Sequence, residues 1–287
     1  MNNSKALGSI PGILPVIAIF LLLSCSGNRD VTTIELQDEI KYLSSDSLKG
    51  RQTGSEGDSL AALYIKNKLS SYGLVPLSGD GFQRFKVIKK VLPGKENSLS
   101  VNGINYTPEK DFMPLGFSSN SGLESEVIFI GYGFNINGDS LKWNDYKGID
   151  VKGKWVMILR SDPEPDNTKS PFIPFSADRD KALLAKDMGA GGVLMVSGPA
   201  FDPQDNFESL NASDFSVDIP VLRIKKEVAD VILSKSKNTI AVLEKKLNDR
   251  RKSIVFSTKA LVNGKSEIVR ENANTRNVVM LLSGQDD

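Results

Sequence analysis

The sequence predicts an α/β protein, and three features lead to this fold class. Residues 155–159 and 191–196 are short apolar runs bounded by glycine or charged residues, which is typical of strands buried in a sheet. Residues 179–188 lie between these runs and have the pattern of a helix that ends at Gly189. The 24 glycines and 13 prolines indicate many turns and therefore many short elements.

The composition is that of a folded protein without a nucleic-acid partner. Of the 287 residues, 40% are hydrophobic and 25% are charged, which are ordinary values for a folded chain. The 36 basic and 35 acidic residues leave a formal net charge of +1, so the totals imply no basic face. The length suits one large domain or two ordinary ones.

Residues 1–24 are expected to be the signal peptide of a bacterial lipoprotein. The apolar run at 10–23 is too short and too interrupted for a comfortable membrane span, which needs about 20 residues. Leu-Leu-Ser-Cys at 22–25 resembles a lipobox, in which the Cys25 thiol takes a diacylglycerol. Residues 25–31 would then be a tether in the bacterial cell envelope. The alternative is an ordinary cleaved signal followed by a chance cysteine, and the membrane leaflet stays open.

Two amphipathic helices are expected after the tether. Thr32 and Glu35 have the spacing of a capping box, and apolar residues recur behind them at helical intervals. A loop with three glycines at 46–57 leads to a second apolar stripe over 60–72, which Gly73 would end. No Gly-Lys-Ser/Thr follows this loop at the spacing of a phosphate loop, so we interpret it as a connection between helices.

Strands and two further helices are expected along the remainder of the chain. Asn102-Gly103 and Asn137-Gly138 have the sequence of tight turns, the first within a hairpin over 99–106. The other expected strands are 82–92, 125–131, 218–224 and 278–282. Returning strands are expected at 253–256 and, on either side of Asn263-Gly264, at 260–262 and 268–269. The further helices are expected at 225–234 and 239–247.

The segment 162–178 is a long loop with four prolines. Its apolar residues Phe172, Ile173 and Phe175 form a possible substrate-facing loop, because long segments without regular structure are often lids or binding loops. The alternative is that these three side chains pack onto their own domain.

Several motifs, in order along the chain, resemble the metallo-aminopeptidases of the M28 family. Residues 43–57, Leu-Ser-Ser-Asp-Ser-Leu-Lys-Gly-Arg-Gln-Thr-Gly-Ser-Glu-Gly, with Tyr-Gly-Leu-Val-Pro at 72–76, look like the N-terminal signature of these enzymes. Residues 143–159 and 181–196 resemble a protease-associated (PA) insert of the same family. Residues 274–284 resemble the strand by which the chain re-enters the zinc domain.

This resemblance implies a division of the chain after the tether into three parts. A PA-like, β-rich α/β domain would span 118–258, inserted into an incomplete M28-type α/β peptidase lobe. The lobe would consist of residues 32–117 and of returning strands at 259–287. In such enzymes the PA insert lies beside the active site, where it is thought to restrict or bind peptide substrates.

The resemblance also implies two zinc ions held by His, Asp and Glu, with a Glu as general base. The chain contains no histidine, so it cannot supply the imidazole ligands, and a Ser-His-Asp arrangement is likewise impossible. The acidic residues around 135–139 and 162–166 do not follow the 12-residue pattern of a calcium loop. We therefore assign no catalytic residue, metal ligand or cofactor to this chain.

Two functions are compatible with these observations. The first is the N-terminal and PA portion of an exported, lipid-anchored zinc aminopeptidase acting on peptides, inactive alone because its catalytic segment would follow residue 287. It predicts exposed apolar stripes at 34–43, 60–72 and 278–282. The alternative is a non-catalytic, surface-anchored module that binds peptides or proteins and unfolds as one compact unit.

Overall fold

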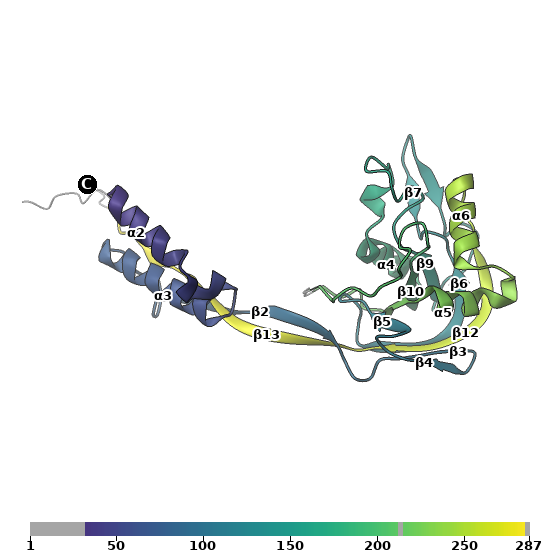
Figure 1. Ribbon diagram of the computed structural model, residues 1–287, viewed down its shortest axis with the longest axis horizontal. Coiled ribbons are helices and arrows are strands. Elements are labelled where there is room, and N and C mark those ends of the chain that lie inside the picture. Colours follow the sequence, from purple (N-terminus) through teal and green to yellow (C-terminus); the bar gives the residue numbers. More distant parts are fainter. Residues whose placement is uncertain (1–31, 212–214, 285–287) are drawn as a thin grey trace, which may run out of the picture.

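The computed structural model describes residues 32–211 and 215–284, which form two bodies joined by a two-stranded ribbon (Figure 1). The predicted signal peptide and Cys25 lie outside the described residues. None of the helices within residues 32–211 and 215–284 has the length and apolar character that crossing a membrane requires.

The smaller body is built from two helices and a short pair of strands. It contains α2 (Thr33–Leu43), a 3-10 turn η1 (Asp46–Arg51) and α3 (Glu56–Ser71), with β1 (Val75–Pro76) antiparallel to β14 (Met280–Leu281). The predicted capping box is confirmed, because the Glu35 amide donates to Thr32 Oγ1 and the Thr32 amide donates to the Glu35 carboxylate. Gly73 ends α3 with a φ of 89°, as expected for a residue past a helix end.

The smaller body has very little core. Within the described structure no residue of α2 is buried, and α3 buries only Gly57, Ala61 and Ala62. Its large apolar side chains instead face outward, with Ile34 71% and Ile40 64% exposed. The others that are exposed in this body are Leu36, Tyr42, Leu60, Leu63, Ile65, Val75, Leu77, Leu281 and Leu282. The expectation of an exposed apolar stripe is therefore met at 34–43, and it is met only in part at 60–72 and 278–282, where several apolar residues are half-buried or buried.

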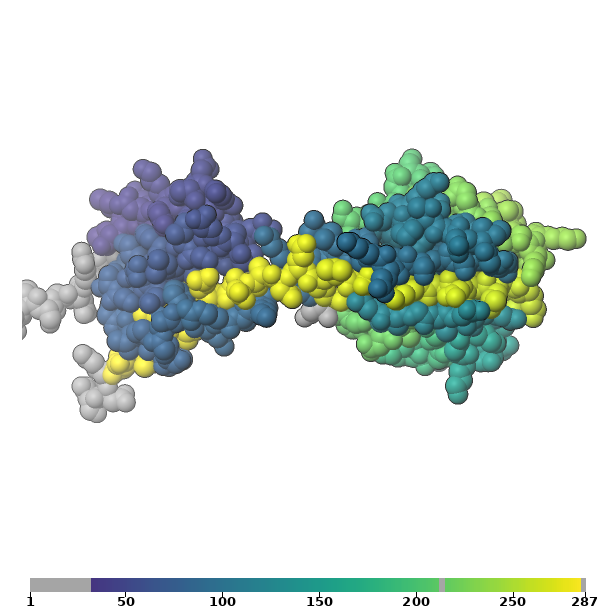
Figure 2. Space-filling view, turned by 90° about the horizontal axis from the view of Figure 1, so that it is seen from below, coloured from purple at the N-terminus to yellow at the C-terminus, as the bar shows by residue number. Residues whose placement is uncertain are grey.

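The ribbon consists of β2 (Phe82–Pro93) and β13 (Ile268–Val278), which pair antiparallel along their whole length. One bulge interrupts the pairing between Glu271 and Asn272. The helix α3 fixes the smaller body to the ribbon, because Thr275 Oγ1 donates to the Asp58 carboxylate at 2.8 Å and Arg276 donates to Ser59. The space-filling view shows the yellow C-terminal strand crossing a narrow waist between the bodies (Figure 2).

The larger body is organised around an eight-stranded sheet with the order β4-β3-β12-β6-β9-β10-β11-β5. The four strands β6, β9, β10 and β11 are parallel to one another, and the other pairings are antiparallel. Their bounds are β3 Ser98–Val101, β4 Ile104–Tyr106, β5 Phe112–Pro114, β6 Ser121–Phe129, β9 Trp155–Leu159, β10 Gly192–Val196, β11 Val221–Ile224 and β12 Phe256–Ser266. A separate hairpin joins β7 (Asn135–Asn137) and β8 (Lys142–Asn144).

Helices cover both faces of this sheet. Alternate residues of β9 point to opposite faces, so Trp155 and Met157 pack with α5 (Lys226–Leu233) and α6 (Ile240–Arg250). Val156 and Ile158 pack instead with α4 (Asp178–Asp187) on the other face. The remaining short helices are η2 (Ile173–Phe175) and η3 (Ser234–Ser236). The predicted α/β fold class is confirmed.

The sheet extends beyond the predicted range of 118–258. Strands β3, β4 and β5 precede residue 118, and β12 continues to Ser266, yet all four belong to the same sheet as the central strands. The reason is hydrogen bonding across long separations, since β12 pairs with both β6 and β3.

The expected strands 260–262 and 268–269 lie in two separate strands, β12 and β13. The prediction of a turn at Asn263-Gly264 is wrong, since β12 continues through both residues to Ser266 and the break comes at Glu267. Gly264 is required by packing: a Cβ there would lie 2.9 Å from Cζ2 of the buried Trp155 indole. Gly192 of β10 packs on the same ring, since a Cβ added at Gly192 would lie 2.5 Å from Cζ3 of Trp155. The expected strand at 253–256 also begins only at Phe256, because the Ser253 hydroxyl donates to the Asp145 carboxylate in a loop.

The exposed helices predict dye binding by the smaller body. The triple variant Ile34→Lys, Ile40→Lys and Leu63→Lys is expected to lower the fluorescence of a hydrophobic dye such as ANS roughly twofold or more, because it places charge across the apolar stripes. The control is the double variant Val242→Lys and Leu261→Lys, which changes two exposed apolar residues of the larger body. Equal fluorescence from the two variants would contradict the assignment of dye binding to the smaller body.

Candidate functional site

The three apolar residues of the predicted substrate-facing loop lie in different environments. Phe172 is buried and stacks on Phe134, with ring centroids 5.5 Å apart, and it meets the Trp143 ring edge-on. It therefore packs onto its own domain, as the alternative interpretation expects. Ile173 and Phe175 are exposed in η2, at the surface of the larger body. Contact of Ile173 and Phe175 with a substrate stays a prediction.

A two-zinc centre does not fit the residues that the structure describes. Among residues 32–211 and 215–284, no three side chains of His, Cys, Asp or Glu gather in a way that could hold a metal ion. The acidic residues at 162–166 serve the loop itself, because Asp162 accepts hydrogen bonds from Ser170 and from the Glu164 amide. Glu164 in turn pairs with Arg251. No catalytic step can be derived through zinc bound to these residues.

A cavity of about 400 Å³ lies beside Arg160, which follows β9, and Arg223 of β11, and it extends along the residues that follow β5. The carboxyl ends of parallel strands meet at one edge of a sheet, and ligands of open α/β sheets commonly bind outside that edge. Here Arg160 follows β9, Ser197 follows β10, and Arg223 lies near the end of β11. The lining includes Met113, Leu115, Phe117, Arg160, Phe207 and Arg223.

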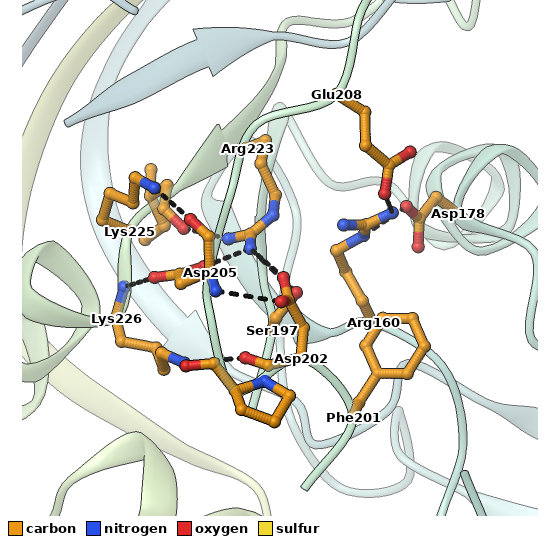
Figure 3. Close-up of polar contacts among 12 residues, drawn as sticks. Arg160, Asp178, Ser197, Phe201, Asp202, Asp205, Glu208, Arg223, Lys225 and Lys226 are labelled. Carbon is orange, nitrogen blue, oxygen red and sulfur yellow. Dashed lines mark hydrogen bonds and ion pairs between the residues drawn. The ribbon is translucent and has the colours of Figure 1, made fainter. Parts of the chain in front are cut away.

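Arg223 is a buried cation with most of its donors engaged (Figure 3). Its guanidinium donates to Ser197 Oγ at 2.8 Å, to the carboxylates of Asp205 and Asp202, and to the Ile224 carbonyl. Burial lowers the pKa of Arg223, and the Asp205 carboxylate opposes that shift. Among the described residues its Nε–H has no hydrogen-bond partner. A buried donor of this kind is costly unless something accepts from it.

The segment 202–207 is fixed over the strand ends by lysines from the start of α5. The Asp205 carboxylate accepts from the Lys226 amide at 2.7 Å, and Lys226 Nζ donates to the Asp202 carbonyl at 2.8 Å. Lys225 Nζ donates to the Asp205 carbonyl and lies 4.4 Å from the centre of the Phe207 ring. These contacts hold Phe207 in the lining of the cavity.

The Arg160 guanidinium has a close ion-pair partner on its Nε side and a distant one on its Nη2 side. Its Nε donates to Asp178 Oδ2 at 2.6 Å, where both side chains are mostly buried. Its Nη2 lies 3.8 Å from Glu208 Oε1, and the Glu208 side chain is 77% exposed. Phe201 lies beside the guanidinium, 5.7 Å from ring centre to Cζ (Figure 3).

A second buried cation, Lys181 on α4, lies outside this cavity. Its Nζ donates to the Leu159 and Ser161 carbonyls and lies over the rings of Tyr132 and Phe134. Burial lowers the pKa of Lys181 to about 7, opposed mainly by the charge of Asp178.

Sequence reasoning did not identify the cavity or its arginines. A usable signal was present, because Arg223 interrupts the apolar run Val-Leu-Arg-Ile and a charged residue inside a buried strand needs a partner. Arg160 directly follows a buried strand, which places it at the sheet edge. The pairing of these two positions depends on the strand order, which local patterns do not contain.

Comparison with known proteins identifies the central part of the chain. Residues 118–232 match the PA domain family, which confirms the prediction of a PA domain, while its predicted bounds of 118–258 stay a prediction. No protein of curated function matches the sequence.

Solved structures of aminopeptidases are similar to the chain over part of their length. An aminopeptidase from Aneurinibacillus sp. strain AM-1 is 18% identical, with a TM-score of 0.44, over 83% of this chain and 45% of that one. A zinc aminopeptidase from Bacillus subtilis is 20% identical with a TM-score of 0.35, over 83% and 44%. A peptidase M28 precursor from Shewanella amazonensis SB2B is 16% identical with a TM-score of 0.33, over 84% and 51%. The chain spans about half the length of these structures.

The lowered pKa of Lys181 predicts a rise in stability at alkaline pH. Between pH 7 and the ordinary lysine pKa of about 10.4, the unfolded chain binds the proton that the folded chain has released. The free energy of unfolding should therefore increase with pH in this window, by up to about 1.4 kcal/mol per pH unit.

Urea unfolding at about pH 7.5 and about pH 9.5 measures this contribution. Lys181→Met should remove it from the pH slope, although the variant is less stable because two carbonyls lose their donor. Lys186→Met, on the same helix but exposed beside Asp218, should keep the slope of the natural protein. A Lys181→Met slope equal to that of the natural protein would show that Lys181 titrates normally.

Proposed function

We propose that this chain is the N-terminal and PA-domain portion of an exported, lipid-anchored zinc aminopeptidase of the M28 type. In this proposal the PA part restricts or positions peptide substrates. The zinc ligands and the general base come from a segment that follows residue 287. The chain by itself is inactive.

The observation that carries the proposal is the path of the chain between its two bodies. It leaves the smaller body along β2, builds the larger body, and returns along β13 directly beside β2. The pairing of β1 with β14 then joins, within the smaller body, the segment that precedes β2 to the segment that follows β13. A PA domain inserted within a peptidase lobe requires this connectivity, and the PA match at 118–232 lies inside the excursion.

The exposed apolar surface of the smaller body also supports the proposal. Helix α2 has an apolar stripe and no buried residue in the described structure. Its Tyr42 ring contacts Tyr64 of α3, but Ile34, Leu36 and Ile40 remain exposed, so most of the apolar face that would normally stabilise the helix is unpacked. A peptidase lobe completed by further strands and helices would supply that partner. The motif at 43–57, which resembles the M28 signature, lies in this same body.

The coding sequence downstream of codon 287 tests the proposal most directly. It is expected to continue in frame with a His-x-Asp motif and then further acidic zinc ligands. The continued chain should hydrolyse aminoacyl reporters with zinc, whereas the 287-residue chain should not. A stop codon directly after codon 287 would favour the alternative, a non-catalytic binding module. Zinc-dependent hydrolysis by the 287-residue chain alone would contradict both functions.

Lipid anchoring has its own test. We expect the natural protein to sediment with membranes and to incorporate labelled palmitate, and Cys25→Ser to lose both properties, because the thiol is the acceptor of the diacylglycerol. Ser24→Ala keeps the thiol and a small residue before it, and serves as the control. Membrane association of Cys25→Ser equal to that of the natural protein would exclude the anchor.

A further inference from the structure

We propose that the cavity lined by Arg160 and Arg223 binds the C-terminal residue of a peptide. Its carboxylate would pair with Arg160, and its apolar side chain would lie against the cavity wall. The inference takes peptides as ligands from the proposed function, but it does not depend on the zinc centre. It concerns residues of the larger body only.

Arg160 provides a cationic edge that is oriented before any ligand binds. The bond from its Nε to Asp178 fixes the guanidinium plane, and both side chains are about 15% exposed, so water screens the pair only in part. A guanidinium has five N–H donors, and this bond uses one side of the fork. The Nη2 side remains directed toward Glu208 in the cavity lining.

Glu208 occupies that side as a weak and replaceable partner. At 3.8 Å the Nη2–Oε1 separation is too long for a hydrogen bond, and the exposed Glu208 side chain contributes little as an ion pair. A ligand carboxylate that approaches to hydrogen-bond distance would make a stronger, charge-assisted contact. We therefore interpret Glu208 as holding the place of a ligand carboxylate.

Arg223 adds a second reason to expect an anionic or acceptor group in this cavity. It lines the cavity, its side chain is 3% exposed, and its buried Nε–H lacks a partner among the described residues. Asp205 and Asp202 pair with its guanidinium and balance its charge. Arg223 and Arg160 thus place two cations in the lining of one cavity.

The wall of the cavity suits an apolar side chain next to that carboxylate. Met113 and Leu115 come from β5 and the residues after it, while Phe207 and Leu210 come from the segment above the strand ends. Cations contact Phe207, since Lys225 and Arg223 lie near its ring. A terminal carboxylate joined to an apolar residue matches this combination of charged and apolar lining.

Calorimetric titration of the 287-residue chain with three peptides tests the proposal. Acetyl-Ala-Leu-Leu with a free carboxylate should bind roughly tenfold or more tightly than its C-terminal amide, because a hydrogen bond to a charged group contributes that much. A third peptide, acetyl-Ala-Glu-Leu amide, carries a carboxylate on an internal side chain. If it binds as tightly as the free acid, the assignment to a C-terminal residue is overturned.

Three variants separate this site from a general effect of charge. Glu208→Gln should tighten binding of the free acid several-fold by removing the competing carboxylate, and Glu126→Gln, an exposed glutamate outside the cavity, should leave binding unchanged. Arg160→Gln should weaken binding of the free acid roughly tenfold or more and leave binding of the amide unchanged. If Arg160→Gln does not fold, the Glu208→Gln result still decides.

The proposal is overturned if the acid and the amide bind equally, if neither binds at millimolar concentration, or if Glu208→Gln has no effect. These outcomes are independent of the aminopeptidase proposal. If the chain selects the free acid but its coding sequence ends at codon 287, the peptide site is supported and the zinc aminopeptidase is contradicted. If the coding sequence continues into a zinc enzyme but acid and amide bind equally, the aminopeptidase is supported and the peptide site is contradicted.

Discussion

The antiparallel pairing of β2 with β13 is the constraint on which the arrangement of both bodies depends. It runs from Phe82 opposite Val278 to Pro93 opposite Ile268, so the chain enters and leaves the larger body side by side. Because the two strands share their backbone hydrogen bonds, neither end of the larger body is free to move apart from the other. The ribbon thereby makes the larger body an insertion within the smaller one.

Buried charge at the carboxyl edge of the sheet links the fold to its candidate ligand. Arg223 replaces an apolar residue inside β11, and a buried guanidinium is tolerated only where carboxylates and carbonyls satisfy it. Asp205 supplies that compensation because Lys226 fixes its loop from the start of α5. These contacts of Arg223, Asp205 and Lys226 also form part of the cavity, so the residues that stabilise the loop are the ones that give the cavity its charge. Arg160 and Asp178 repeat this arrangement at the end of β9, which β10 separates from β11.

Most elements of the fold follow from local patterns, whereas the site follows from strand order. Hydrophobic periodicity and capping residues predict α2, α3, β9 and β10, because burial and helix capping act over a few residues. Asn263-Gly264 has the sequence of a turn but lies inside a strand. Its glycine is needed because the Trp155 indole, distant in sequence, packs against the backbone there. Phe172 and Ile173 are neighbours with opposite environments, which composition cannot distinguish. The arginine cavity needs β9, β10 and β11 to be adjacent, and no local pattern specifies that.

The ribbon also determines the order in which the chain can fold during synthesis. Asn277 meets Gln83 across a separation of 194 residues, so β2 lacks its partner β13 until residues 268–278 have left the ribosome. Contacts between such distant residues form late and slowly. Helices α2 and α3 are synthesised before β13, so their apolar faces stay exposed to solvent until the smaller body can be completed. A chaperone that shields nascent chains would meet them in that interval.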